Sequence, residues 1–427
     1  MLKKIQTKRF FESPDGDNYY FGYFDTPQVS MDDSKILGIK CNSIDRVPDP
    51  EKGDIADVGY FDLKNNNNFI KIGTTRSFNW QQGCMLQFCG PDYNEKIIYN
   101  DFDGKKYVSK IYDIVKEETS IISEPIYAMF PCGTRALTID FSRHFWCRRG
   151  YSYGNIVDNH KNKDIVEGDG IWLIDLLKNQ STKVIGIEEM INEQHISSMQ
   201  GSAHYLEHMT INDSGEEFIF LHRWKFEEGG IHSRLYLCDT KDYKYKIIND
   251  SGRMSHYCWK DNQNIIGYGG VENRINRLRK NKSLLRSFFR FFLPIYHFFI
   301  RDFSKISKKL TGDSYININV VNGGINKIAK DLISDDGHPS FLKGENIFFT
   351  DTYARSKHNQ KPKLIAHDLD SKKSHMLDEL GSIPELDETP VRCDLHPRVS
   401  KSGNIITIDT MDKGYRSIYA YKIKLKK

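Results

Sequence analysis

Four histidines recur at equivalent positions of a repeated sequence pattern, namely His208, His256, His338 and His396. Proline follows the last two of them, and Asp394 lies two residues before His396. Neutral imidazole together with carboxylate suits manganese, zinc and similar divalent metals. We therefore predict a metal site made of His256, His338, Asp394 and His396. The alternative is a structural role, in which each ring bonds the backbone or an aspartate of a neighbouring repeat.

A second group of reactive side chains lies in the segment FSRHFWCRRGYSYGN, residues 141–155. Because this segment comes directly after a predicted strand, we expect it to be a loop. Arg148 and Arg149 are suited to binding a carboxylate or phosphate with two hydrogen bonds. Tyr151 offers an aromatic face on which a sugar ring can stack. The alternative is a solvated basic loop.

Further positions carry side-chain types that commonly contact sugars. They lie at the repeat anchors, in the segment FNWQQGCMLQF, or where a strand of the fourth repeat closes. We expect substrate contacts from Trp80, Gln81, Gln82, Tyr127, His204, His222, Arg223 and Arg398.

The elements that must position these residues follow a sevenfold repeat. Its anchors lie near residues 27, 87, 127, 208, 256, 338 and 396, and each is followed by a turn with Gly, Asn or Asp and then an apolar strand. A second strand pair completes each unit, and two hairpins make a four-stranded propeller blade. We predict an all-β protein, a single seven-bladed β-propeller over residues 1–427, whose anchors converge on the central channel. The alternatives are a β-sandwich or two separate β domains.

The fifth repeat contains an insertion, predicted to be helical, at residues 271–313. Residues 274–309 hold eleven Lys or Arg and one acid, which leaves −6 on the rest of a chain whose net charge is +4. Their longest uncharged run, 291–300, is too short to cross a bilayer. A basic segment rich in Phe and Leu favours contact with an anionic membrane surface. The alternative is a helical hairpin packed on the propeller or on a partner protein.

The compartment is predicted from the N-terminus and the cysteines. The first residues are basic but no apolar core follows them, so we do not expect them to form a signal peptide. The eight cysteines have irregular spacings and no CxxC pair, which is typical of free thiols in a reducing compartment. We expect a cytoplasmic protein, peripheral to the inner face of the membrane. An acidic body with an apolar basic segment argues against nucleic-acid binding.

Three segments, FNWQQGCMLQF, HMTINDSGEEFIFLHRW and CDLHPRVSKSGNIITIDT, resemble the oligogalacturonate lyase type of propeller. The best match is the last repeat, with His396-Pro397, Asp409 and the segment 414–419. The resemblance implies a seven-bladed propeller with a divalent metal, usually manganese, held by His and Gln, that cleaves uronic-acid polymers by β-elimination. Only His396 carries over directly, because Asp394 stands where the family has a histidine.

The first hypothesis is therefore a metal-dependent, lyase-like enzyme acting on an acidic oligosaccharide or polysaccharide. In it His208 or His256 is the base, Arg148 or Arg149 binds the carboxylate, and Tyr151 is the acid. A second hypothesis is a transferase or hydrolase acting on lipid-linked oligosaccharide in surface-polysaccharide biosynthesis, suggested by the insertion. A third is a propeller that binds glycan or protein without catalysis, because a fold does not fix a function.

Overall fold

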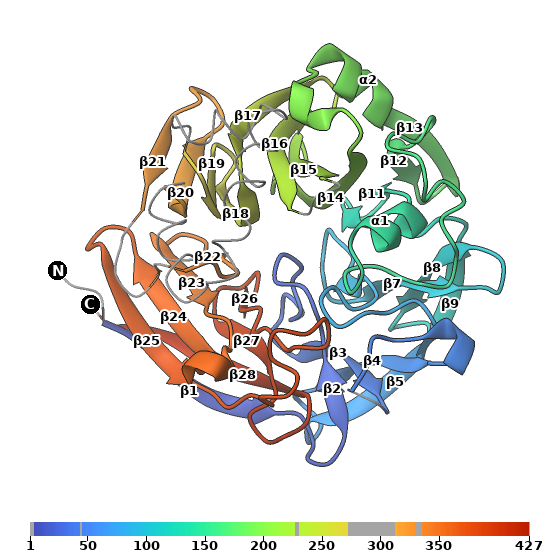
Figure 1. Cartoon of the computed structure of the whole chain (residues 1–427). Coiled ribbons are helices and arrows are strands. Elements are labelled where there is room, and N and C mark those ends of the chain that lie inside the picture. The colour runs from blue at the N-terminus through green and yellow to red at the C-terminus, as the bar shows by residue number, and fades with distance from the viewer. Residues whose placement is uncertain are drawn as a thin grey trace.

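Seven four-stranded antiparallel sheets are arranged radially around one axis, and Figure 1 shows them as the blades of a ring. The computed structural model describes residues 4–42, 45–226, 230–271, 312–328, 333 and 335–426. Blade one contains β2 (Asn18–Tyr20), β3 (Lys35–Cys41), β4 (Ala56–Asp62) and β5 (Asn68–Thr75), and blade two contains β6 (Gln87–Phe88), β7 (Lys96–Phe102), β8 (Tyr107–Asp113) and β9 (Glu118–Ile122). Blade three contains β10 (Ala128–Met129), β11 (Arg135–Thr138), β12 (Gly170–Asp175) and β13 (Gln180–Gly186), and blade four contains β14 (Ala203–Ile211), β15 (Glu217–Lys225), β16 (Ile231–Asp239) and β17 (Tyr245–Gly252). The predicted seven-bladed propeller is thus confirmed.

The remaining blades include the one that closes the ring. Blade five contains β18 (Met254–Asp261), β19 (Asn264–Gly269), β20 (Ser314–Asn319) and β21 (Ile325–Lys327), and blade six contains β22 (Ser340–Leu342), β23 (Ile347–Asp351), β24 (Lys363–Asp368) and β25 (Lys373–Glu379). Blade seven contains β26 (Arg398–Val399), β27 (Ile405–Thr410), β28 (Ser417–Lys426) and, as its outermost strand, β1 (Lys4–Glu12). Because β1 pairs antiparallel with β28, hydrogen bonds between the two ends of the chain close the ring.

Local chemistry explains where the strands turn. Asp103, Asp113 and Asp175 each follow or end a strand, and each carboxylate accepts hydrogen bonds from the backbone N–H groups two and three residues later. Such Asx turns reverse the chain without tertiary contacts. The apolar residues between them, such as Ile97 and Ile98 in β7, are fully buried between neighbouring blades.

Among the described residues, two short helices and three single-turn 3-10 helices interrupt the sheets. Helix α1 (Phe141–Cys147) begins after β11, where the Asp140 side chain accepts from the backbone N–H groups of Ser142 and Arg143. Helix α2 (Ile187–Glu193) follows β13, and the 3-10 turns are Pro50–Lys52, Ser197–Met199 and Ser356–His358. In the part of the chain that the structure describes, no helix has the length and apolarity needed to cross a membrane.

The predicted insertion lies between two strands of blade five. Strand β19 pairs with β20 along its whole length, from Asn264 opposite Asn319 to Gly269 opposite Ser314. The chain between these strands therefore leaves and re-enters the same blade. Most of it, residues 272–311, lies outside the described residues. The prediction that the insertion is helical concerns this part of the chain and stays a prediction.

Candidate metal centre

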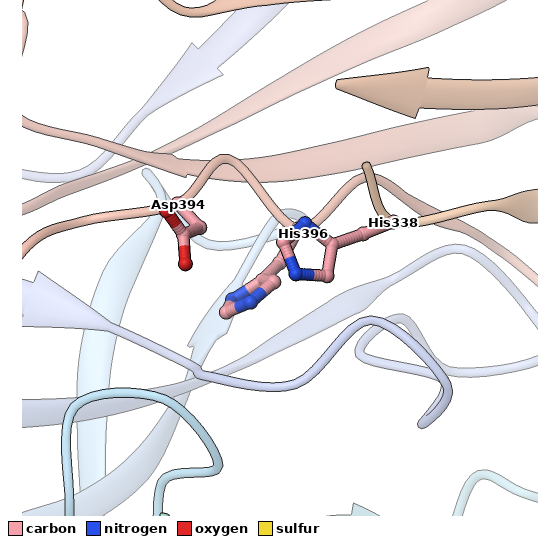
Figure 2. A group of neighbouring side chains, drawn as sticks. All are labelled: His338, Asp394 and His396. Atoms are coloured by element: carbon pink, nitrogen blue, oxygen red, sulfur yellow. The ribbon is translucent and has the colours of Figure 1, made fainter. Parts of the chain in front are cut away.

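His338, Asp394 and His396 converge near the axis from two neighbouring connections, one before β22 and one before β26 (Figure 2). One potential ligand atom from each side chain lies within 4.8 Å of the other two. All three residues are buried. The structure thus brings together three of the four residues predicted from the sequence to bind a metal.

Asp351, at the end of β23, holds both histidines of this group. Its carboxylate lies 2.9 and 3.0 Å from Nδ1 of His338, and it accepts from the backbone N–H groups of His338 and His396 at 2.8 and 3.0 Å. Burial lowers the pKa of His338, but Asp351 and Asp394 raise it overall above its usual value. A carboxylate on Nδ1 leaves Nε2 as the ligand atom, which is the common arrangement of metal-binding histidines.

His396 has the features of an unsaturated ligand. Its Nε2 is buried and has no hydrogen-bond partner among the described residues. Burial, with His338 next in importance, holds its pKa well below the usual value, so the ring is neutral. Its φ of +46° is in the left-handed region, as is the +56° of His208. Such backbone strain in non-glycine residues is concentrated at functional sites.

His256, the fourth predicted ligand, lies beside the group without being part of it. Its ring centre is 4.1 Å from that of His338, and its Nδ1 lies 3.1 Å from an oxygen of Asp336. Its Nε2 is buried and unpaired among the described residues. Burial and the neighbouring His338 lower the pKa of His256 to about 4. The ring is therefore a neutral proton acceptor at physiological pH.

The donor set fits a divalent metal. Two imidazoles and one carboxylate suit manganese or zinc. The buried Nε2 of His396 has no hydrogen-bond partner among the described residues, and a bound metal would supply one. Asp394 is meanwhile paired with Nε of Arg392, at 3.0 and 3.1 Å. A bound ion would compete with that guanidinium for the carboxylate.

A buried network of charges lies across the axial region from this group. Glu207 in β14 is fully buried; it pairs with Arg148 at 2.5 Å, with Arg223, and with Nε2 of His144 at 3.1 Å. Burial alone would raise the pKa of Glu207, but Arg148 and Arg223 hold it well below its usual value.

Tyr151 connects this network to the metal group. The Arg148 guanidinium lies 3.8 Å from the centre of its ring, and its hydroxyl accepts from Arg392 at 2.9 Å. Arg148 and Tyr151 from the predicted catalytic set thus lie together, whereas Arg149 is exposed to solvent. The connection runs from Glu207 through Arg148, Tyr151 and Arg392 to Asp394.

The loop 21–28, between β2 and β3, brings two aromatic side chains to the histidines. The Tyr23 hydroxyl is hydrogen-bonded to the ring of His208, with Nδ1 at 2.7 Å, and its ring packs edge-on against His396. The Phe24 ring centre lies 5.2 Å from that of His338 and 5.7 Å from that of His256. Sequence analysis missed both residues, although the adjacent Gly22 marks an unusual turn.

Arg398, predicted to bind substrate, anchors this loop instead of lining an open surface. It is buried, pairs with Asp409 at 2.8 Å and donates to the Gly22 carbonyl at 2.8 Å. Asp409 in turn accepts from the Gly22 backbone N–H at 2.8 Å. The ion pair therefore fixes the position of Tyr23 and Phe24.

The other predicted substrate-contacting residues fall into two groups. Some lie beside the charged network: Gln81 donates to the Arg392 carbonyl, and Arg223 pairs with Glu207. The Tyr127 hydroxyl accepts two hydrogen bonds, one from the Gln82 side chain and one from the backbone N–H of His208. Others are buried elsewhere: Trp80 donates to the Arg46 carbonyl, and His204 and His222 bond each other at 2.9 Å beside Trp224 inside blade four.

Comparisons with known proteins show where this architecture occurs. No family model matches the sequence, and no curated protein matches it either. Among solved structures, oligogalacturonate lyase from Vibrio parahaemolyticus aligns with a TM-score of 0.59 at 10% identity, over 98% of this chain and 96% of its own. An oligogalacturonate lyase in complex with manganese aligns with a TM-score of 0.60 at 13% identity, over 99% and 98%. At these identities the likeness concerns the fold, and the chain is a seven-bladed propeller of the architecture that these lyases share.

Proposed function

We propose that this protein is a metal-dependent, carbohydrate-active enzyme that cleaves a uronic-acid-containing glycan by β-elimination. The observation that carries the proposal is the convergence of His338, Asp394 and His396 beside three arginines in the axial region. The shared fold with a manganese-bound oligogalacturonate lyase supports the same assignment.

In this proposal His338, Asp394 and His396 hold the metal, and Asp351 orients the His338 imidazole and accepts a hydrogen bond from the backbone N–H of His396. The bound metal would neutralise the substrate carboxylate and thereby acidify the adjacent C5 proton. Arg148, Arg223 and Arg392 outnumber their two partner carboxylates, Glu207 and Asp394. These three guanidinium groups offer hydrogen-bond donors and positive charge to the carboxylates of an acidic glycan.

His256 is the favoured base. Asp336 holds its Nδ1, its Nε2 is unpaired among the described residues, and its lowered pKa keeps the ring neutral. His208 is less suited because its ring is already bonded to the Tyr23 hydroxyl. An ordered base with a free acceptor nitrogen meets the geometric requirement for proton abstraction.

Tyr151 is the favoured acid. Its hydroxyl accepts from Arg392, so its own proton is free to be donated. In the elimination, the C5 proton passes to His256, the C4–O bond breaks with its electron pair going to the leaving oxygen, and a C4=C5 double bond forms. The leaving oxygen then takes the Tyr151 proton, which keeps the step balanced.

Elemental analysis and a product assay test the proposal together. Purified protein should contain about one divalent metal per chain, and should release an unsaturated, ultraviolet-absorbing product from an acidic glycan. His338→Ala and His396→Ala should lose both, whereas His160→Ala, at an exposed histidine, should lose neither. A wild-type protein without metal and without product would refute the assignment.

A glycan-binding propeller without catalysis is the second candidate. The observation in its favour is the Arg392–Asp394 ion pair, because it compensates the group's carboxylate without any metal. Saturable binding of an acidic glycan by a protein that holds no metal and forms no product would favour it.

A further inference from the structure

A separate cavity of about 170 Å³ lies along the same axis, and we name it the second mouth. Several of its lining residues lie in the turns that follow innermost strands. Examples are Asp213 after β14, Lys343 after β22 and Lys401 after β26. His338, Asp394 and His396 instead precede innermost strands. Since the innermost strands of a propeller run in the same direction along the axis, the second mouth and the metal group lie at different depths.

The loop 21–28 separates the two regions. Tyr23 and Phe24 pack against the histidines, and both also line the second mouth. Neither His338, Asp394 nor His396 is among the residues that line this cavity. A ligand in the second mouth would therefore be separated from the metal group by two aromatic rings.

One side of the second mouth carries two lysines that share one carboxylate. Lys343 pairs with Asp213, and Nζ of Lys401 lies 3.8 Å from the other oxygen of Asp213. Burial, followed by the charge of Lys343, lowers the pKa of Lys401 to about 8. A second anion placed between these ammonium groups would relieve their repulsion.

Aromatic rings form the walls beside these lysines. Nζ of Lys401 lies 4.1 Å from the centre of the Tyr93 ring, and Phe341 and Trp259 also line the cavity. The Trp259 ring is held in place because its Nε1 donates to the Thr210 carbonyl at 3.1 Å. Fixed aromatic faces beside cationic groups suit a flat ring that carries an anionic substituent.

Asp25 gives the cavity a second polar end. Its carboxyl lies on the loop 21–28 and accepts from the Thr26 hydroxyl at 3.2 Å. Burial raises the pKa of Asp25 to about 7. No ion pair of Asp25 is present among the described residues, so it can accept hydrogen bonds from hydroxyl groups of a ligand.

We propose that the second mouth binds one acidic sugar residue, with its carboxylate between Lys343 and Lys401, its ring against the aromatic walls and its hydroxyls toward Asp25. This site lies beyond the proposed catalytic function, because it uses none of the groups assigned to metal binding or proton transfer. The volume of the cavity is sufficient for a sugar ring.

Binding of D-glucuronate to the full-length protein tests this site, measured by calorimetric titration and ligand-observed NMR. Glucuronate should bind saturably, whereas D-glucose and inorganic phosphate should bind at least about tenfold more weakly, because each lacks one half of the recognised chemistry. The Lys343→Gln/Lys401→Gln double variant should weaken glucuronate binding about tenfold or more. Lys64→Gln is the matched control, since Lys64 also pairs with an aspartate, Asp32 at 3.1 Å, but in blade one.

Two further variants make the outcome decisive. Lys343→Arg/Lys401→Arg should retain binding, because the positive charges remain. His338→Ala should also retain it, whether or not the protein proves to be a metal-dependent lyase. Absence of saturable binding, equal binding of glucose, or loss of binding in His338→Ala alone would overturn the proposal.

Discussion

Glu207 keeps a negative charge inside the protein because cationic and polar groups surround it. Arg148 and Arg223 pair with one carboxylate oxygen, and His144 bonds the other. A buried ion pair contributes little net stability compared with apolar packing, but removing one partner leaves the others desolvated and unpaired. The prediction for this residue therefore concerns stability before it concerns activity.

We predict that Glu207→Gln lowers the free energy of unfolding by about 3 kcal/mol, because the buried Arg223 and the partly buried Arg148 lose their counter-charge. Urea denaturation at pH 7 measures this, with Glu216→Gln, at an exposed glutamate, as the control. A loss equal to that of the control would contradict the buried pairing.

The same substitution has a pH signature. Because the pKa of Glu207 in the folded protein is well below the ordinary 4.5, its contribution is complete above pH 4.5 and declines as the pH falls toward the folded value. The difference in unfolding free energy between wild type and Glu207→Gln should therefore be constant between about pH 6 and 8 and shrink below about pH 4.5. If the difference in unfolding free energy grew as the pH fell, the lowered pKa of Glu207 would be contradicted.

Arg392 sets the charge at the metal group. Its guanidinium pairs with Asp394, the only carboxylate of the three-residue group. We predict that Arg392→Gln tightens manganese binding about tenfold, because a positive charge beside the cation is removed and Asp394 is released. Metal titration by calorimetry measures the change. Arg46→Gln, which breaks an Arg–Asp pair in blade one, should leave the affinity unchanged, and weaker binding in Arg392→Gln would refute this role.

At the scale of elements, the loop 21–28 depends on a close approach of two backbones. Gly22 has a φ of +110°, and a Cβ added there would lie 2.5 Å from the backbone nitrogen of Gly83. Such a contact has no relief through side-chain movement. Gly22 therefore allows the loop to reach the axis next to blade two.

We predict that Gly22→Ala destabilises the protein by more than about 2 kcal/mol and weakens metal binding, because Tyr23 and Phe24 are displaced from the histidines. Gly16→Ala is a matched control: its φ is +85°, and a Cβ there meets nothing within 4 Å. The free energy of unfolding of the control should fall by only about 1 kcal/mol, because its alanine must adopt a positive φ but meets no other atom. Equal destabilisation of the two variants would show that the approach to Gly83 is unimportant.

The elements that sequence analysis predicted are those fixed by local chemistry. Hairpins with Asx turns and apolar strands are encoded within about fifteen residues, so the seven anchors and the convergence of His338, Asp394 and His396 followed from their register. The contacts of Arg398 could not be predicted, because its partners, Asp409 and Gly22, meet only when blade seven closes against blade one. Glu207 directly precedes the anchor His208, but its ion pair with Arg148 depends on the conformation of the loop after α1.

At the scale of the whole molecule, positive charge is concentrated in one part of the sequence. Residues 274–309 carry a charge of +10, and the rest of the chain carries −6. The flanking strands β19 and β20 belong to one blade, so removing the segment between them leaves every described strand in place. The membrane hypothesis can therefore be tested without dismantling the ring.

We predict that the full-length protein sediments with anionic phosphatidylserine-containing vesicles but not with neutral phosphatidylcholine vesicles, because basic and aromatic side chains together favour an anionic interface. Replacing residues 274–309 with a short Gly/Ser linker should abolish sedimentation, and the circular dichroism spectrum should keep its β-sheet signal. Raising the salt concentration should weaken binding, since the attraction is screened. If the deletion variant still bound the vesicles, the membrane contact would belong to the propeller itself. If the full-length protein bound neither kind of vesicle, a protein partner for this segment would be favoured.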